Sequence, residues 1–408
     1  MKKSAILKSI LISCVSLLLT IGCFSQNWQG WRGENRDGKV KNFNSPQTWP
    51  AELTIVWHTA VGLGDSSPVL KDGKIYLFVK QDNDEVAMCL DANTGKQIWK
   101  KTVNTAPEIS GPASSHPGPR STPFITEDKI YLLGAGGIFS CLNSNSGEII
   151  WQNKDYKEVP QFYTSASPLI SGEMCIIHLG GNDNGTVVAF NKNNGEIIWQ
   201  MKGEPCTYSS PVIMNIENEE VLVVQSETDL AGVSMDGKLL WKIPTPVERR
   251  FYNSSTPIID GQNIIIAGQG KGTFSLKIQK TNNSYSFKEN WNNPEFGVSF
   301  NTPVLKDGYI YGSEGRLGKL FCLDAATGKT CWSDTTTLNR FASTLDLGKV
   351  MLVLTANGEM IIYEPNHERF VQKASYTVSN TEIYAHPLVT ENKFLVKDKE
   401  TLTCWVLK

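Results

Sequence analysis

The sequence predicts an all-β protein, an eight-bladed β-propeller of four-stranded blades in which an N-terminal strand completes the last blade. Three observations support this fold class. A tight-turn signature recurs at one fixed spacing, a strand-opening signature recurs along the whole chain, and the two ends each supply part of one blade. The strand-opening signatures lie ~40–55 residues apart, which is the length of four short strands with their turns.

The tight-turn signature is a glycine followed four positions later by tryptophan, with aspartate or asparagine upstream. The Asp or Asn side chain accepts backbone N–H bonds within the turn, and glycine takes the positive φ that closes it. Tryptophan then begins the next strand and presents a large apolar face to a neighbouring blade. The structural residues of this docking signature are Asp91, Gly95, Trp99, Gly147, Trp151, Gly195, Trp199, Gly237, Trp241, Asp324, Gly328 and Trp332.

The strand-opening signature is a pair of small or polar residues before proline. Hairpin signals such as Asp72-Gly73 follow it, and alternating runs such as residues 74–78 predict strands between the hairpins. The eight members, of which residues 342–344 are a degenerate copy, are Ser66-Ser67-Pro68, Ser121-Thr122-Pro123, Ala166-Ser167-Pro168, Ser209-Ser210-Pro211, Ser255-Thr256-Pro257, Asn301-Thr302-Pro303, Ala342-Ser343-Thr344 and Ala385-His386-Pro387.

The two ends of the repeat region predict how the ring closes. Residues 403–407 form a third strand that has no fourth, and residues 55–58 form a strand that precedes the first complete unit. We expect residues 55–58 to pair with residues 402–407 in one blade, which removes both free ends of the ring. This assigns residues 52–408 to the propeller and residues 26–51 to an N-terminal extension.

Residues 1–25 have the pattern of an export signal. Lysines at the start precede an apolar run over residues 10–21, which is too short to span a bilayer comfortably. Two processing routes fit the sequence: cleavage after Ser25, or lipidation of Cys23 within a loose lipobox. We therefore expect an exported periplasmic protein, or an outer-membrane lipoprotein if Cys23 is lipidated, with contact to the membrane only through that anchor.

Charge and cysteine usage exclude some classes of partner and site. The formal net charge of −2 over 408 residues gives no basic footprint for nucleic acid. Cys89, Cys141, Cys322 and Cys404 occupy equivalent places just before the turn, where Ala189 stands in another unit. We expect them to be buried small residues in different blade interfaces, not disulfide partners or metal ligands. The five histidines have no metal-ligand spacing, so no metal site is predicted.

The docking signature resembles the tryptophan-docking repeat of pyrroloquinoline-quinone (PQQ) propellers. It stands here as Cys89-x-Asp91-x-x-Thr94-Gly95-x-x-x-Trp99 and again at residues 322–332. Residues 28–38 and residues 118–123 are similar to two further blocks of bacterial PQQ-like β-propeller repeat proteins. That group is similar in architecture to the propeller lipoprotein of the outer-membrane β-barrel assembly machinery and, more distantly, to quinoprotein alcohol dehydrogenases.

The resemblance implies the scaffold without the redox chemistry. Quinoprotein enzymes hold the quinone between a tryptophan and a vicinal Cys-Cys disulfide and coordinate Ca²⁺ beside a catalytic aspartate. This sequence has no adjacent cysteines and no Cys-x-x-Cys-His haem motif. No cofactor is therefore expected, PQQ is disfavoured, and no catalytic residue is assigned.

One set of residues forms a candidate ligand site. The segments that lead into the innermost strands collect aromatic residues and arginines, and in a propeller these segments converge around one mouth of the central channel. Clustered guanidinium groups favour an anion or an aromatic face among them, and tyrosines offer stacking surfaces; the alternative is packing between blades. The candidate mouth residues are Arg120, Tyr163, Tyr208, Arg249, Arg250, Tyr252, Phe300, Arg340, Tyr384 and His386.

Two functional hypotheses from different classes follow from these features. The first is a non-catalytic binding or scaffold protein of the bacterial cell envelope. It would dock envelope proteins or glycans through its face and channel mouth, as a monomer within a larger assembly. The alternative is a quinone-binding or other enzyme, similar to a PQQ-dependent dehydrogenase, that uses the channel mouth. The sequence contains no P-loop, nucleophile elbow or zinc-protease motif.

Overall fold

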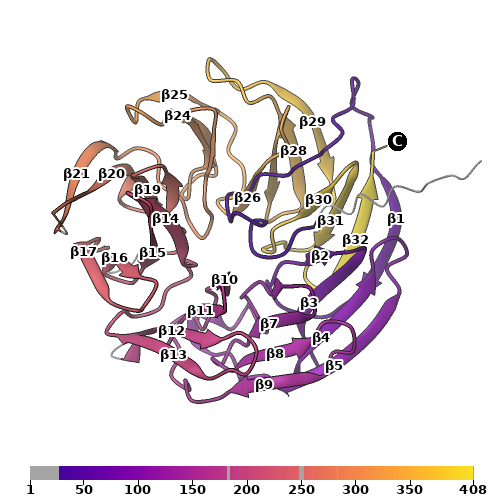
Figure 1. The fold of residues 1–408 in the computed structure, drawn as a ribbon. Coiled ribbons are helices and arrows are strands. Elements are labelled where there is room, and N and C mark those ends of the chain that lie inside the picture. The colour runs from indigo at the N-terminus through magenta and orange to yellow at the C-terminus, as the bar shows by residue number, and fades with distance from the viewer. Residues whose placement is uncertain (1–26, 182–183, 248–251, 283, 408) are drawn as a thin grey trace, which may run out of the picture.

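The computed structural model describes residues 27–181, 184–247, 252–282 and 284–407 and shows eight four-stranded antiparallel sheets in a ring (Figure 1). This is an eight-bladed β-propeller, so the predicted fold class is confirmed. In seven blades the four strands follow one another in sequence from the channel outward. The hydrophobic core lies between neighbouring blades, because each buried cluster joins side chains from adjacent sheets.

The strands have the following bounds, with blades numbered along the chain. Blades 1 and 2 contain β2 (Val69–Lys71), β3 (Lys74–Gln81), β4 (Asp84–Asp91), β5 (Gln97–Thr105), β6 (Phe124–Ile125), β7 (Lys129–Leu133), β8 (Phe139–Asn143) and β9 (Ile149–Asn153). Blades 3 and 4 contain β10 (Leu169–Ser171), β11 (Met174–Leu179), β12 (Thr186–Asn191), β13 (Ile197–Lys202), β14 (Val212–Ile216), β15 (Glu219–Gln225), β16 (Asp229–Ser234) and β17 (Leu239–Pro244).

The second half of the ring continues the same pattern. Blades 5 and 6 contain β18 (Ile258–Asp260), β19 (Asn263–Gly268), β20 (Gly272–Thr281), β21 (Ser284–Asn293), β22 (Val304–Lys306), β23 (Tyr309–Ser313), β24 (Leu320–Asp324) and β25 (Thr330–Ser333). Blades 7 and 8 contain β26 (Ala342–Asp346), β27 (Met351–Thr355), β28 (Glu359–Tyr363), β29 (Gln372–Thr377), β30 (Leu388–Thr390), β31 (Lys393–Lys397), β32 (Thr401–Val406) and β1 (Thr54–Ala60).

Blade 8 closes the ring with strands from both ends of the repeat region. Its order is β1-β32-β31-β30, and β1 pairs antiparallel with β32, with Ile55 opposite Trp405 and His58 opposite Thr403. The predicted closure is confirmed. The outer edge of β32 is therefore covered, and the N-terminal strand fixes the last blade against the first.

Trp99, Trp151 and Trp199 each lie against the turn glycine of the next blade, namely Gly147, Gly195 and Gly237. A Cβ atom built on Gly195 would lie 2.6 Å from the indole of Trp151, and the Trp151 indole N–H donates to the carbonyl of Lys192 in the same turn at 3.3 Å. Asp91 Oδ1 accepts from the backbone N–H groups of Asn93 and Thr94, which holds the turn in shape. Only glycine leaves room for the ring.

The structure adds two docking tryptophans and changes the role of a third. Trp57 lies over Gly95, and Trp291 lies over Gly328, although neither tryptophan has a glycine four positions upstream. Trp241 is buried against β19 and β20 without a docking glycine, and its indole N–H has no partner. Trp241 still contacts the neighbouring blade, where β20 and β21 extend into a long hairpin in place of a short turn with a glycine.

The strand-opening signature forms a series of hydrogen bonds around the channel, from blade 8 through blades 1 to 6. The residue before proline donates its backbone N–H to the hydroxyl group of the equivalent residue in the next blade, so Ser and Thr at this place join blade to blade. The links, 2.9–3.3 Å long, join His386 to Ser67, Ser67 to Thr122, Thr122 to Ser167, Ser167 to Ser210, Ser210 to Thr256 and Thr256 to Thr302.

The N-terminal extension enters the ring of blades instead of lying beside it. Figure 1 shows the segment, in indigo, running inside the ring near β26, and isolated bridges join Trp28 to Leu70 and Lys39 to Asp346. Arg36 is buried in the channel. Its two terminal nitrogens donate to carbonyl groups of blades 3 and 4, namely those of Ser167, Pro168 and Pro211, at 2.7–2.9 Å.

Arg32 makes the same kind of contact with blade 6. Its Nη1 donates to the carbonyl of Thr302 at 2.5 Å, and its Nη2 donates to the carbonyl of Pro303 at 2.9 Å. Burial lowers the pKa of Arg32 to about 10 and that of Arg36 to about 9, so both guanidinium groups stay charged at neutral pH. The extension therefore ties blades 3, 4 and 6 together across the channel axis.

The docking contact predicts a specific cost for adding one methyl group. We expect Gly195→Ala to destabilise the protein more than Gly172→Ala, although both glycines have positive φ. The positive φ costs ~1–2 kcal/mol at either site, whereas only at Gly195 does the new Cβ meet Trp151, which adds ~1–3 kcal/mol of overpacking. Denaturant unfolding of the two variants measures the difference; equal losses would contradict the docking role.

Candidate functional site

A blind cavity of about 440 Å³ opens at one mouth of the channel, where the sequence places its candidate ligand site. Tyr163 and Tyr252 touch its walls through ring contacts, whereas Arg249 and Arg250 lie outside the described residues. The predicted mouth residues that line the cavity are Arg120, Tyr208, Phe300, Arg340, Tyr384 and His386. The structure thus brings these six side chains together, and their role as ligand contacts remains a prediction.

The walls of the cavity are a belt of aromatic rings contributed by successive blades. Each ring stands on a segment that joins the outermost strand of one blade to the innermost strand of the next. Neighbouring ring centroids lie 4.5–6.5 Å apart, mostly edge to face, which is a favourable geometry for aromatic pairs. In order, the belt contains Phe162, Tyr208, Tyr252, Phe300, Phe341, Tyr384 and His116.

Two aromatic residues at the mouth have a backbone conformation that bulky side chains rarely adopt. Tyr163 has φ +65° and Phe300 has φ +54°. Backbone strain of this kind persists only where surrounding contacts enforce it, and it gathers at binding sites. The Phe300 N–H donates to Ser254 Oγ at 3.1 Å, and the Tyr163 hydroxyl donates to the carbonyl of Glu108 at 3.0 Å. Both rings are therefore held in place from neighbouring segments.

The two described arginines of the mouth have different surroundings. Arg120 is buried and donates to the carbonyls of His116, Gly118 and Ala113, so it fixes the loop that carries the short 3₁₀ helix η1 (Gly111–Ala113). Its guanidinium also lies 5.6 Å from the centre of the Tyr163 ring. An organising role for Arg120 in the loop accounts for these contacts without a ligand.

Arg340 differs because its side chain is exposed. Its guanidinium carbon lies 4.6 Å from the centre of the Phe341 ring, a cation–π contact. Within the described part of the chain, no carboxylate lies at ion-pair distance from Arg340. Arg340 is thus a cation at the cavity that has an aromatic support and no acidic partner.

Asp65 and His116 form a polar pair in the cavity wall that the sequence did not reveal. His116 Nδ1 and Asp65 Oδ2 lie 2.9 Å apart, and the imidazole meets Tyr384 edge to face at 4.5 Å. The two residues come from the connections into blades 1 and 2. Because the two residues are 51 positions apart, no local sequence pattern links them. The sequence shows only that both precede strand-opening signatures, which places them near the mouth.

The floor of the cavity is closed by the N-terminal extension and one histidine. Trp31 and His386 line the cavity and meet edge to face at 5.7 Å. Burial, followed by the nearby charge of Arg32, lowers the pKa of His386 to about 3, so this imidazole is neutral at physiological pH. Because Arg32 and Arg36 fill the channel below, the mouth is a recess and not the opening of a passage.

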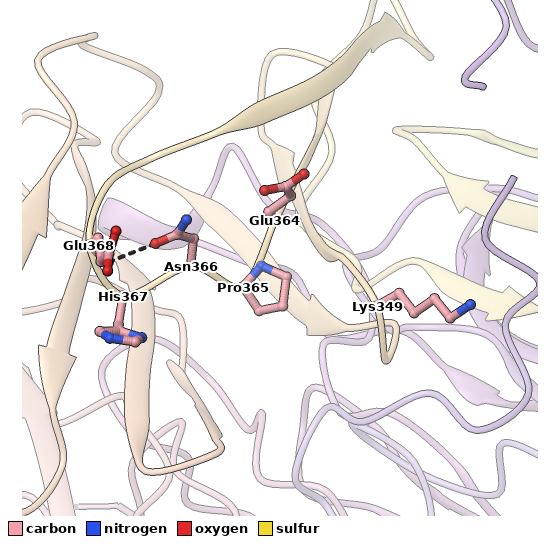
Figure 2. A pocket seen from close by; sticks show the side chains of 6 residues that line it. All are labelled: Lys349, Glu364, Pro365, Asn366, His367 and Glu368. Carbon is pink, nitrogen blue, oxygen red and sulfur yellow. Dashed lines mark hydrogen bonds between the residues drawn. The ribbon is translucent and has the colours of Figure 1, made fainter. Parts of the chain in front are cut away.

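A second hollow lies on the outside of blade 7, at the loop of residues 364–368 and Lys349 (Figure 2). Its groups serve the fold: the Asn366 carbonyl accepts from the Trp332 indole N–H at 2.7 Å, and Asn366 Oδ1 accepts from the Glu368 N–H at 2.7 Å. His367 stacks on Tyr309 at 4.5 Å. This hollow is the docking turn for Trp332, and we assign no ligand to it.

No group of three or more His, Cys, Asp or Glu side chains in the described part of the chain is arranged to hold a metal ion. Likewise, none of the helices in that part has the length and apolar character needed to cross a membrane. The four equivalent cysteines at positions 89, 141, 322 and 404 are buried and free, as predicted. The structure adds that each lies opposite a docking tryptophan on the neighbouring strand.

The closed ring, the docking turns and the recessed mouth define a PQQ-like repeat β-propeller. A family model described as outer membrane protein assembly factor BamB matches residues 37–200 and residues 83–334 of the sequence, which together span most of the chain. The chain therefore belongs to this family.

Curated relatives of two kinds resemble the sequence. The outer membrane protein assembly factor BamB of Yersinia pestis is 24% identical over 421 aligned residues, which cover 96% of this chain and 96% of that protein. The polyvinylalcohol dehydrogenase of Sphingopyxis sp. (strain 113P3) is 22% identical over 334 residues. That second match covers 68% of this chain but only 48% of the dehydrogenase.

Solved structures of the same two kinds share the fold. BamB from Moraxella catarrhalis superposes with a TM-score of 0.64 at 13% identity, covering 88% of this chain and 98% of that chain. The quinohemoprotein alcohol dehydrogenase from Comamonas testosteroni gives a TM-score of 0.69 at 14% identity, covering 93% of this chain and 80% of that chain. At such low identity these likenesses establish the propeller fold alone.

Proposed function

We propose that this protein is a non-catalytic scaffold of the bacterial cell envelope that docks a partner protein at the channel mouth. The observation that carries the proposal is the blind mouth itself. Seven rings and one exposed cation surround a recess whose floor the chain closes with its own N-terminal extension. Aromatic and arginine side chains around a pocket are the residues that dominate binding energy in protein interfaces.

Membership of the BamB family supports the same proposal. The relative from Yersinia pestis is named as an outer membrane protein assembly factor and matches over nearly the whole chain. An assembly factor acts by holding other proteins, and a rigid propeller offers them a fixed face. The export pattern in residues 1–25 fits an envelope location, either free in the periplasm or tethered through Cys23.

The scaffold proposal predicts where a partner protein touches the ring. A photo-activated phenylalanine analogue placed at Tyr163, on the mouth, should cross-link an envelope protein in intact cells, and mass spectrometry identifies it. The matched control carries the analogue at Phe287, an exposed ring on the outer strand β21. Cross-links from Phe287 and none from Tyr163 would show that partners use the outer edge and would overturn docking at the mouth.

A quinone-binding oxidoreductase is the second candidate, favoured by the polyvinylalcohol dehydrogenase match and by the enclosed aromatic cavity. Against it, the sequence has no vicinal cysteines to pack on the quinone and no haem motif to pass electrons onward. We expect no dye-linked alcohol oxidation when PQQ and Ca²⁺ are added to the purified protein. Robust turnover in that assay would replace the scaffold proposal with the enzymatic one.

A further inference from the structure

Phe300 is the most exposed ring of the aromatic belt and lies in its middle. Its side chain is 43% exposed, and its ring contacts those of Phe162, Tyr208, Tyr252 and Phe341. An apolar ring left in water and held at a positive φ is unfavourable on both counts. The fold holds the Phe300 side chain in place but leaves it exposed to solvent. Phe300 is therefore placed to contact an apolar group of a binding partner.

The charges around Phe300 favour an anion. Among the described residues that line the cavity, two arginines stand against one carboxylate, that of Asp65, and Asp65 is hydrogen-bonded to His116. The donors of Arg120 are used by backbone carbonyls, as described above. Arg340 remains: its guanidinium lies over the Phe341 ring, and no described carboxylate lies at ion-pair distance from it, although Glu295 and Glu314 line an adjacent hollow that Arg340 also borders. A carboxylate is the complementary group, because guanidinium binds it through two parallel hydrogen bonds.

The size and floor of the cavity set the dimensions of the ligand. A volume of about 440 Å³ closed by Trp31 and His386 accepts one or two side chains but not a folded surface. A protruding loop or an extended segment of a partner can enter such a recess while the rest of the partner stays on the propeller face.

The belt fits a protein side chain better than a sugar. Sugars stack on open ring faces, whereas these rings mostly cover one another edge to face, and only Phe300 among them is widely exposed. A neutral glycan would also leave the Arg340 charge without a partner. An aromatic or aliphatic side chain, by contrast, can join the belt edge to face beside Phe300.

We infer that the mouth binds a segment of a partner protein in which an apolar or aromatic side chain lies beside a carboxylate. Phe300 contacts the apolar side chain, and Arg340 pairs with the carboxylate. This inference rests on the proposed docking function and names the chemistry that the docking surface selects. It makes Phe300 and Arg340 the two residues that determine specificity at the mouth.

Defined probes test the inference on the purified full-length protein. The probe is a fluorescein-labelled peptide, Gly-Ser-Phe-Asp-Phe-Ser-Gly, compared with the same peptide carrying asparagine in place of aspartate, and binding is followed by fluorescence anisotropy. We expect the aspartate peptide to bind about tenfold more tightly than the asparagine peptide. Arg340→Gln should abolish that preference, while Arg369→Gln, which removes an exposed charge from the outer loop of blade 7, should keep it.

Phe300 is tested by a substitution that keeps its backbone conformation. Asparagine tolerates positive φ better than other non-glycine residues, so Phe300→Asn removes the ring with little added strain. We expect it to weaken both peptides about tenfold and to leave the preference for aspartate intact. Near-ultraviolet circular dichroism and the unfolding midpoint confirm that each variant is folded.

The outcomes separate this inference from the proposed function. If Arg340→Gln keeps the preference for aspartate, or Phe300→Asn binds both peptides normally, the inference is wrong. Saturable binding of chitohexaose at the mouth, with no peptide binding, would also overturn it in favour of a glycan. A cross-linked envelope partner at Tyr163 together with failure of the peptides would sustain the docking function and refute only the proposed chemistry. Peptide binding that depends on both Phe300 and Arg340, without any cross-linked envelope partner, would sustain the proposed binding chemistry and refute the docking function in the envelope.

Discussion

Removing residues 27–60 should abolish cooperative unfolding of the whole propeller. This deletion removes β1, so β32 is left with an unpaired edge and blade 8 has three strands. It also removes Trp57, whose indole covers Gly95 and donates to the Ala92 carbonyl at 3.2 Å, and whose loss costs ~3–5 kcal/mol by analogy with other buried aromatics. Because blade 8 contacts blade 1 through this strand, the ring loses its closure.

A second deletion separates the strand from the channel insert. A variant that lacks only residues 27–51 keeps β1 and Trp57 but loses Arg32 and Arg36. We expect it to unfold cooperatively at a lower denaturant concentration, whereas the variant without residues 27–60 should show a broad transition and aggregate through the free edge of β32. Unfolding is followed by tryptophan fluorescence and by circular dichroism. A fully stable protein without residues 27–60 would refute closure by the terminal strand.

Replacing Arg36 should destabilise the protein, and lysine should be no better than methionine. Arg36 donates to three carbonyl groups from two blades, and each carbonyl left unpaired in the channel costs ~1–3 kcal/mol. Part of that loss is regained by Arg36→Met, because a buried cation without a carboxylate partner disappears. The net expectation for Arg36→Met is a loss of about 3 kcal/mol.

The lysine variant distinguishes geometry from charge. Lysine keeps the positive charge, but its single ammonium group is more strongly hydrated and cannot span carbonyls of both blades as the planar guanidinium does. Arg36→Lys should therefore lose as much stability as Arg36→Met in urea titrations, and Arg369→Met, at an exposed site, should lose almost none. If lysine restores full stability, the role of Arg36 is electrostatic and the bridging role is wrong.

The docking turns were predictable because all their parts lie within about ten residues. In the turn that Asp91 opens, the carboxylate, the positive-φ glycine and the following tryptophan are set by local geometry, so the sequence pattern and the structure agree. Trp57 and Trp291 do not fit the sequence pattern, because neither has a glycine four positions upstream. Each nevertheless lies against the turn glycine of the next blade. Trp241 and Trp332 have the upstream glycine, but the segments that they contact in the next blade contain no docking glycine, which their own local pattern does not show.

The mouth was predictable in outline and not in detail. Aromatic residues before seven of the eight innermost strands converge once the ring closes, and Tyr208, Phe300 and Tyr384 do so. The pairing of Asp65 with His116 and the burial of Arg120 in its own loop depend on how two connections fold against each other. No spacing within one segment carries that information.

The sequence by itself determined the repeat, the number of blades, the docking turns and the strand that closes the ring, since all of these follow from short-range turn chemistry and from counting. Only the tertiary structure decided that the N-terminal extension fills the channel. Arg36 and Arg32 bond carbonyls 131 to 271 positions away, and a backbone carbonyl has the same identity in every residue, so no side-chain pattern could name these partners. The ring brings those carbonyls to the channel, and because buried carbonyl groups need hydrogen-bond donors, the two arginines bind there.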